Sequence, residues 1–240
     1  MSNQFARTEL LLGVEALEKL SRSRVAVFGI GGVGGYVCEA LARSGVGKFD
    51  LIDNDKVSLT NLNRQIIATH KTIGRAKAEV MKEHILDINP DADVRVYECF
   101  FLPENGDEFP FEEYDYVVDA VDTVTAKIEL VRRAEEKNIP IISSMGTGNK
   151  LDAGQFIIAD IYQTRMCPLA KVMRHELKKR GIQKCKVIYS EEMPVRPIKG
   201  QGLQEEEKPV GKRSVPGSVA YVPSVAGLMI AGEVIKDLIQ

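Results

Sequence analysis

A glycine cluster that directly follows a short apolar run is the feature that most constrains how this chain can fold. The run covers residues 25–28, and Gly29, Gly31, Gly32 and Gly34 follow it before a helical stretch begins. In a strand–turn–helix unit, the first glycine allows a tight turn, the second lets the backbone approach a phosphate, and the last lets the helix pack closely on the sheet. The new helix also directs unpaired N–H groups and its positive dipole end toward an anion. The pattern therefore predicts a phosphate-binding β-α-β unit.

An acid lies where such a unit holds a ribose. Asp53 ends a second, mostly apolar run, residues 49–52, and lies about twenty residues after the glycines. A glycine-rich turn in a parallel sheet that binds no ligand is the alternative interpretation. Because strand, turn, helix and distal acid all occur in order, the sequence favours a nucleotide site.

The residues after Asp53 distinguish between kinds of nucleotide. Nicotinamide and flavin enzymes are the usual owners of the glycine pattern, and they need only the first acid to hold a ribose. Arginine binds phosphate oxygens through forked donors, and lysine supplies a point charge. Both occur here together with amides that can orient the chain, which suits a triphosphate. We take as candidate nucleotide-binding residues Asn61, Arg64, Gln65 and Lys77, with Asp55 in the same stretch.

At these positions the chain resembles the ATP-dependent adenylating enzymes of the ThiF/MoeB type, relatives of the ubiquitin-activating enzymes and of the activating enzymes of molybdopterin and thiamine synthesis. The resemblance extends over nearly the whole chain, and it rests on the glycine turn, Asp53, residues 61–65, Lys77 and residues 119–122. It implies an α/β fold, with a Rossmann-like, mainly parallel sheet, helices on both faces, and a C-terminal extension of strand and helix.

The resemblance also implies roles for single residues. Asp53 would bind the ribose of ATP, Arg64 and Lys77 its triphosphate, and Asp122 a Mg²⁺ ion near the reacting phosphate. Without the resemblance, Asp119 and Asp122 could equally cap the helix that follows them. Together, the cations and the metal would neutralise charge as it moves to the leaving pyrophosphate.

A further implied role concerns the N-terminus. Members of this superfamily carry an arginine six residues before a glycine, and Arg7 and Gly13 match that spacing. The resemblance implies a homodimer in which Arg7 is catalytic and reaches the triphosphate site of the partner. Taken alone, the stretch predicts an amphipathic helix over residues 14–20 that packs on the sheet.

Length and composition are consistent with one large domain. The chain has 240 residues, of which 44% are apolar and 28% charged, enough for a substantial core. We expect an ATP-binding half, residues 1–150, and a substrate-binding half, residues 151–240. Within the second half, residues 191–216 combine prolines, glycines and a glutamate run, which predicts a mobile loop.

Cellular location also follows from the sequence. No apolar run reaches the roughly 18 residues that span a bilayer, and we expect no association with membranes. The four cysteines lack zinc-finger spacing, and a disulfide framework is not expected in a chain of this length. We therefore expect a cytoplasmic protein.

Periodicity predicts the remaining elements. We expect helices over residues 73–88, 125–137, 169–180 and 225–239, and strands over residues 93–98, 114–122, 140–145, 155–159 and 186–189.

The helix at residues 169–180 carries a basic face. Lys171, Arg174 and Lys178 follow helical spacing, while Leu169, Val172, Met173 and Leu177 are expected to face the core. Because the net charge of the chain is −2, a local basic stripe is the expected means of meeting a nucleic acid, here the backbone of a tRNA. A solvated basic face without a partner is the alternative.

Cys167 precedes this helix and a proline. We expect a partly buried structural cysteine there. The alternative is an exposed thiol that acquires thiolate character from the helix dipole and accepts an acyl group.

Three functional hypotheses remain open. The chain looks most like the tRNA threonylcarbamoyladenosine dehydratases, which use ATP to adenylate the threonyl carboxylate of a modified tRNA base and then close a ring. An alternative is activation of the C-terminal glycine of a sulfur-carrier protein, although many such enzymes hold zinc through two CxxC pairs that this chain lacks. A redox or non-catalytic nucleotide binder is the third possibility, and it leaves Arg64, Lys77 and Asp122 unexplained.

Overall fold

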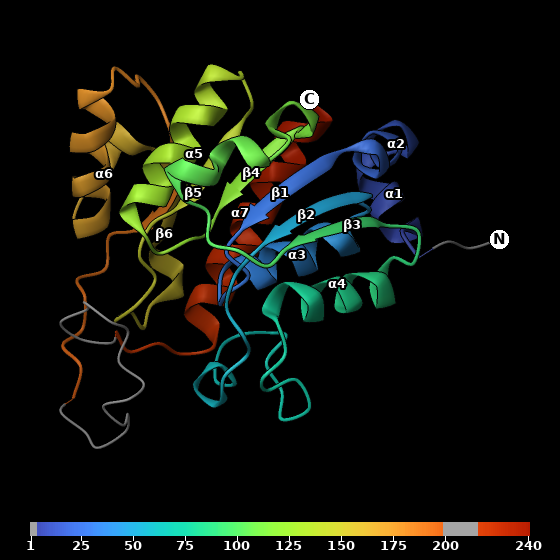
Figure 1. Ribbon diagram of the computed structural model, residues 1–240, viewed down its shortest axis with the longest axis horizontal. Helices are drawn as coiled ribbons and strands as arrows, with labels where there is room; N and C mark the ends of the chain where they lie inside the picture. The colour runs from blue at the N-terminus through green and yellow to red at the C-terminus, as the bar shows by residue number, and fades with distance from the viewer. Residues whose placement is uncertain (1–3, 199–215) are drawn as a thin grey trace.

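A seven-stranded sheet with the order β3-β2-β1-β4-β5-β7-β6 forms the centre of the protein (Figure 1). The structure is a computed structural model that describes residues 4–198 and 216–240. Neighbouring strands are parallel, except that β6 runs antiparallel to β7 at one edge. The strands are β1 (Arg24–Phe28), β2 (Lys48–Ile52), β3 (Asp93–Tyr97), β4 (Tyr116–Asp119), β5 (Ile141–Ser144), β6 (Phe156–Asp160) and β7 (Lys186–Ser190).

Helices cover both faces of this sheet (Figure 1). The helices are α1 (Ala6–Leu12), α2 (Val14–Arg22), α3 (Gly34–Arg43), α4 (Lys77–Ile88), α5 (Val124–Glu136), α6 (Pro168–Lys179) and α7 (Tyr221–Ile239). The predicted α/β class with a mainly parallel sheet is therefore confirmed.

The central strands explain the continuous apolar runs of the sequence. All residues of β1 and β4 are buried, and side chains that alternate along a strand enter different cores. Val25 and Val27 pack in the core that includes α3, α4 and α7, whereas Ala26 and Phe28 pack with α5 and an aromatic cluster. The alternation places one hydrophobic core on each side of the sheet.

A glycine brings α7 against the start of α3. A Cβ atom at Gly227 would lie 2.4 Å from the carbonyl oxygen of Val33, so a larger residue there would separate the two helices. Through this contact, α7 packs against the end of the glycine turn, where α3 begins.

The predicted helices agree with the structure except at two starts. The helix predicted over residues 73–88 begins only at Lys77, because Gly74 has a φ of 85° and Ala76 forms an antiparallel bridge with Lys56. The last helix begins at Tyr221 instead of residue 225 and takes Pro223 into its first turn, where a missing N–H costs little.

The substrate-binding half predicted for residues 151–240 shares the sheet with the first half. β6 and β7 continue the sheet beyond β5, and the division at residue 150 stays a prediction. Of the predicted mobile loop, residues 199–215 lie outside the described residues, and residues 191–198 form neither helix nor strand. No helix within the described ranges is long and apolar enough to cross a membrane.

Candidate active site

A cavity of about 290 Å³ opens where β1, β2 and β4 end. The chain runs from β1 outward to β2 and β3 and then returns to β4 on the other side of β1, so this is the switch point at which open α/β sheets bind ligands. The charged residues that line the cavity are Asp53, Asp55, Arg64, Lys77 and Asp122. The structure thus brings together residues that are up to 69 positions apart in the chain.

The glycine turn has the geometry that its sequence predicts. Gly29 has a φ of 90°, and a Cβ atom there would lie 2.7 Å from the carbonyl oxygen of Ala120. A Cβ at Gly34 would lie 1.8 Å from the oxygen of Gly29, so α3 can approach the strand only with glycine at this position. Gly29, Gly31 and Gly32 line the cavity, while Gly34 lies behind it. The open space at Gly31, where the nearest atom to a Cβ is 3.9 Å away, leaves room for a phosphate.

Asp53 joins the glycine turn to the loop after β2. Its Oδ2 accepts a hydrogen bond from the N–H of Ile30 at 2.7 Å, and its Oδ1 accepts one from the N–H of Asp55 at 2.8 Å. Burial raises the pKa of Asp53, and Lys77 and these two N–H groups offset only part of that effect. The carboxylate is therefore fixed at the edge of the cavity where a ribose hydroxyl could reach it.

Lys77 begins α4 and points its ammonium group at Asp55. The Nζ–Oδ2 distance is 2.7 Å, and Lys77 is only 5% exposed. A buried ammonium needs an anionic partner. Asp55 supplies one here, and a phosphate oxygen would be equally suitable.

Arg64 lies in the turn that follows the short 3₁₀ helix η1 (Leu59–Asn61). Its Nη1 donates to the carbonyl oxygen of Thr60 and to Oδ1 of Asn63, each at 2.9 Å. Burial lowers the pKa of Arg64, but a guanidinium remains charged at neutral pH. The site therefore holds a half-buried, positively charged fork.

Two other predicted nucleotide-binding residues are buried next to this turn and lie outside the described lining of the cavity. Asn61 is buried, and its Oδ1 accepts from the N–H of Ser58, so its visible role is to close the turn. Gln65 is buried beside Gly31, and its Oε1 has no hydrogen-bond partner within the described residues. Neither belongs to the described lining of the cavity, and direct contact with a nucleotide stays a prediction for both.

The acid that ends β4, Asp119, and the acid that follows the strand, Asp122, differ in environment. Asp119 is fully buried and pairs with Lys127, so the possibility that it caps the next helix is wrong. Asp122 is exposed at the cavity rim and accepts a long hydrogen bond, 3.4 Å, from Thr123 Oγ1. Thr123, not Asp122, is the N-cap of α5, which leaves the Asp122 carboxylate beside the cavity.

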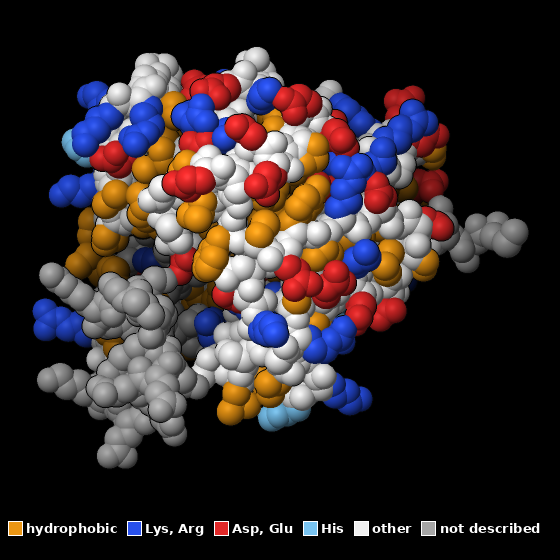
Figure 2. Space-filling model, in the orientation of Figure 1, with side chains coloured by type: hydrophobic (Ala, Val, Ile, Leu, Met, Phe, Trp, Pro, Cys, Tyr) orange, Lys and Arg blue, Asp and Glu red, His pale blue; other side chains and the backbone are white. Residues whose placement is uncertain are grey.

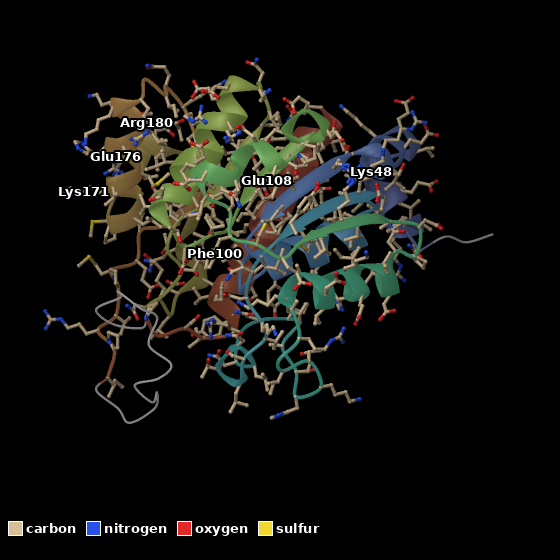
Figure 3. All side chains as sticks on the ribbon, in the orientation of Figure 1. Lys48, Phe100, Glu108, Lys171, Glu176 and Arg180 are labelled. Carbon is tan, nitrogen blue, oxygen red and sulfur yellow. The ribbon has the colours of Figure 1, made fainter. Side chains whose placement is uncertain are left out.

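Several lining residues escaped the sequence analysis. Thr147 and Ser218 form part of the wall, and Cys99, Phe100 and Phe101 follow β3. Phe100, labelled near the centre of Figure 3, is 60% exposed. Phe100 and Asp53, the acid predicted to bind a ribose, line the same cavity, so this exposed ring offers a surface on which a base could stack. A run of two phenylalanines directly after a predicted strand was the available signal.

Arg7 lies on α1, outside the described lining of this chain's own cavity. Every residue of α1 is at least partly exposed, and Leu10 and Leu11 are 85% and 87% exposed. A role for Arg7 in a partner subunit stays a prediction.

The predicted basic face on α6 is only partly as expected. Lys171 and Lys178 are exposed, but Arg174 is half-buried and donates to the carbonyl oxygen of Thr164 at 2.9 Å. Val172, expected in the core, is 46% exposed. Blue side chains gather on the outer side of α6 in Figure 2, and Figure 3 shows Lys171 there.

Cys167 is buried, with 5% exposure, which agrees with the structural interpretation and not with an exposed, reactive thiol. Its N-cap position on α6 places the thiol in the core between α5 and α6. This placement favours the structural reading of the residue.

Known proteins resemble most or all of this chain. The tRNA threonylcarbamoyladenosine dehydratase of Bacillus subtilis is 45% identical over 244 residues, which cover 100% of this chain and 96% of the relative. The protein of the same name from Escherichia coli is 41% identical over 73% of this chain and 65% of its own length. A crystal structure of the E. coli enzyme in complex with ATP superposes with a TM-score of 0.87 and 34% identity, over 98% of this chain and 93% of that one. The sequence model of the ThiF family matches residues 2–240, and the chain belongs to the ThiF family.

Proposed function

We propose that this protein is an ATP-dependent tRNA threonylcarbamoyladenosine dehydratase. It adenylates the threonyl carboxylate of threonylcarbamoyladenosine in tRNA and then closes the cyclic form of the nucleoside. One observation carries the proposal: Asp53, Arg64, Lys77 and Asp122 line a single cavity beside a phosphate-binding glycine turn, in a chain 45% identical to an enzyme of that name.

The chemistry uses ATP as a co-substrate. The carboxylate oxygen attacks the α-phosphorus, the bond to the bridging oxygen breaks, and pyrophosphate leaves. A nucleophile of the same modified nucleoside then attacks the activated carbonyl carbon, and AMP leaves as the ring closes. The nucleoside loses the elements of one water, which are taken up as ATP is converted to AMP and pyrophosphate.

The cavity residues act mainly through charge. An anionic carboxylate has to approach a polyanion, so cations are needed where charge develops on the leaving group. Arg64 and Lys77, which line the cavity, would bind phosphate oxygens, and Asp53 would orient the ribose. A bound Mg²⁺ would neutralise further phosphate charge, and Asp122 is suited to hold it.

The residues fit such a metal only together with the nucleotide. Across residues 4–198 and 216–240, no group of three or more His, Cys, Asp or Glu side chains is placed to hold a metal ion. Mg²⁺ is commonly held by one or two carboxylates together with phosphate oxygens and water. Removing Mg²⁺ with EDTA should therefore weaken binding of ATP far more than binding of AMP, measured by calorimetry.

Activity is tested by incubating the protein with ATP, Mg²⁺ and tRNA that carries threonylcarbamoyladenosine, followed by mass spectrometry of the nucleosides. Loss of one water from the modified nucleoside is the expected result. A parallel reaction with a diglycine-ended sulfur-carrier protein tests the alternative function. Adenylation of the carrier, with the tRNA unchanged, would refute the proposal.

Site variants test the assigned residues. Arg64→Ala, Lys77→Ala and Asp122→Ala should each lower ATP-dependent turnover by about 10²-fold or more. Arg75→Ala is the matched control, because Arg75 lies in the same loop region but pairs with Glu83 on the surface. Substantial activity of Asp122→Ala at saturating Mg²⁺ would remove this residue from the metal site.

We also infer that the active form is a homodimer in which α1 packs on a second copy. The exposed leucines of α1 provide an apolar surface for that contact, and Arg7 would then reach the partner's cavity. Mixing Arg7→Ala subunits with Arg64→Ala subunits should restore about one functional site per heterodimer. No recovery, in a mixture shown to exchange subunits, would place Arg7 in its own subunit or in a structural role.

The basic side of α6 is the proposed tRNA platform, with Lys171, Arg174 and Lys178 as its residues. Lys171 and Lys178 are exposed and can meet phosphates, whereas the bond from Arg174 to Thr164 also fixes the helix. Each lost phosphate contact should lower the log–log salt slope of tRNA binding by about 0.7–0.9.

The variant Lys171→Glu/Lys178→Glu separates binding from stability, because it leaves Arg174 in place. It should weaken tRNA binding and leave ATP binding unchanged. Lys48→Glu is a control, since Figure 3 places Lys48 on the opposite side of the molecule from α6. Unchanged tRNA affinity and salt slope in the double variant would exclude this helix as the platform.

A further inference from the structure

One side of the cavity is built from segments that the nucleotide-binding residues do not supply. Thr147 follows β5, and Ser218 and Pro223 lie just before α7 and in its first turn. The other lining residues come from the turns after β1 to β4 and from the starts of α4 and α5. If ATP occupies those turns, as the proposed function requires, the acceptor carboxylate approaches along the wall of Thr147 and Ser218.

Asn149 holds this wall from the β5 side. Its N–H donates to the carbonyl oxygen of Gly217 at 2.8 Å, and its Oδ1 accepts from the N–H of Gly217 at 2.7 Å. Its own carbonyl oxygen accepts from the N–H of Val195 at 2.7 Å. A single residue thus binds both segments that pass it.

The backbone of Asn149 explains why this residue type is present. Its φ is 59°, in the left-handed region that asparagine tolerates better than most residues. A Cβ at the preceding Gly148 would lie 2.8 Å from Cβ of Pro216. The two segments are therefore in direct contact at this point.

Asn63 holds the same wall from the nucleotide side. Its Nδ2 donates to the carbonyl oxygen of Ser218 at 2.9 Å, and its Oδ1 accepts from Nη1 of Arg64 at 2.9 Å. Only a side-chain amide offers a donor and an acceptor in one rigid group of this size. One amide thereby connects the candidate phosphate-binding guanidinium to the backbone beside Gly217.

We propose that Asn63 and Asn149 are positioning residues that hold Ser218 in the acceptor-side wall and connect that wall to Arg64. This inference rests on the proposed function. Movement of the Arg64 guanidinium toward a phosphate is transmitted through Asn63 to the carbonyl of Ser218, and Asn149 anchors the neighbouring Gly217. ATP binding therefore orders the wall along which the carboxylate enters.

Two test variants and two controls separate the contacts that Asn63 and Asn149 make with residues 217 and 218. Asn63→Asp keeps an acceptor for Arg64 but removes the donor to Ser218. Asn149→Gly keeps the left-handed backbone but removes the acceptor for Gly217, whereas Asn149→Asp keeps both. Asn138→Gly is a matched control, because Asn138 also has a positive φ, 55°, and lies in the turn after α5.

Kinetics should separate positioning from nucleotide binding. Asn63→Asp and Asn149→Gly should raise the KM for modified tRNA by about three- to tenfold, the range of one lost hydrogen bond. The affinity of Asn149→Gly for ATP should stay within about threefold of the wild type, whereas Asn63→Asp should also bind ATP more weakly, because its new carboxylate lies beside Arg64. Asn149→Asp and Asn138→Gly should retain the wild-type KM.

Hydrogen–deuterium exchange tests the wall without tRNA. In the wild type, ATP should slow exchange in a peptide that covers residues 216–222. In Asn63→Asp this slowing should be reduced, and in Asn149→Gly exchange should be faster even without ATP. If both variants exchange and turn over like the wild type, the positioning role is refuted. If the exchange differences appear but the wild-type enzyme leaves the tRNA unchanged, the role of Asn63 and Asn149 in ordering the wall is supported. Only the proposed function then fails.

Discussion

Replacing Lys127 by Met should lower the free energy of unfolding by about 3–5 kcal/mol, because it leaves a buried carboxylate without its counter-ion. The side chains of Lys127 and Asp119 are 1% and 0% exposed. Nζ of Lys127 lies 3.1 Å from both carboxylate oxygens and donates to the carbonyl oxygen of Ser144 at 2.6 Å. Water cannot take over these contacts at such burial.

The size of the effect can be worked through to an observable. For domains of 150–250 residues, 1 kcal/mol corresponds to a shift in Tm of roughly 2–4 °C, so Lys127→Met should melt about 6–20 °C below the wild type. The double variant Lys127→Met/Asp119→Asn leaves no charge at this buried pair. Its loss of stability should be clearly smaller than the sum of the two single losses, as expected for residues in contact.

Urea denaturation followed by circular dichroism measures all three variants. Lys137→Met is the matched control, since Lys137 pairs with Glu112 on the surface with side-chain exposures of 46% and 66%, and its loss should cost less than about 1 kcal/mol. A cost for Lys127→Met no larger than that of the control, or strict additivity in the double variant, would refute the reasoning. Asp119 also accepts a hydrogen bond from the N–H of Val121 at 3.2 Å, and Val121 lines the cavity. A shift of Asp119 would therefore move the cavity wall, so folded Lys127→Met should bind ATP more weakly.

Three further changes have defined outcomes. Gly34→Ala should cost about 3 kcal/mol or more, or prevent folding, because the new methyl group would lie 1.8 Å from a carbonyl oxygen of the turn; soluble yield and Tm report it. Phe100→Ala should weaken ATP binding by about 5- to 100-fold if the ring stacks on the base, while Phe100→Tyr should not. Burial by itself raises the pKa of Glu39, but hydrogen bonds from Arg43 and His84 outweigh it and hold the pKa below its ordinary value. The Glu39 carboxylate therefore stabilises the fold above its pKa in the unfolded chain, and this contribution is lost as the pH falls through its pKa in the folded protein. Glu39→Gln should accordingly lose less stability than the wild type between pH 7 and pH 3.

Local signals were sufficient for the nucleotide side of the site. The glycine turn, Asp53 and Lys77 each occupy a place fixed by a strand end or a helix start. Short stretches of sequence predict such positions, because an apolar run stops there and a turn residue follows. Gly29, Gly31, Asp53 and Lys77 therefore meet in one cavity once the parallel strands align.

Signals of helix phase were weaker. On α6 the core is reached by Ala170, Met173 and Leu177, at positions i, i+3 and i+7, while Val172 lies outside. Alanine is small and gives a weak signal of burial, so the sequence pattern predicts an apolar face that is rotated toward Val172. The same rotation leaves Cys167 on the buried side.

The wall of Thr147 and Ser218 could not be predicted, because its parts are 71 positions apart and neither has a local motif. Their meeting depends on the placement of β5 beside β4 and on the contact between Gly227 and Val33 that fixes α7. Asp119 and Lys127 illustrate the same limit. The lysine lies one turn into α5 and returns toward the strand end, which no pattern in the sequence indicates.

The charges of the cavity are consistent with the proposed need for a metal ion and for an arginine from a second copy of the chain. Its described lining contains three carboxylates, Asp53, Asp55 and Asp122, but only two cations, Arg64 and Lys77. Lys77 already pairs with Asp55, so the local charge is slightly negative before a polyanionic triphosphate enters. A triphosphate binds well there only if further positive charge arrives with it. The proposed function provides two sources of positive charge: a metal ion on Asp122 and an arginine from a second copy. Loss of either source should therefore weaken the binding of ATP much more than the binding of AMP.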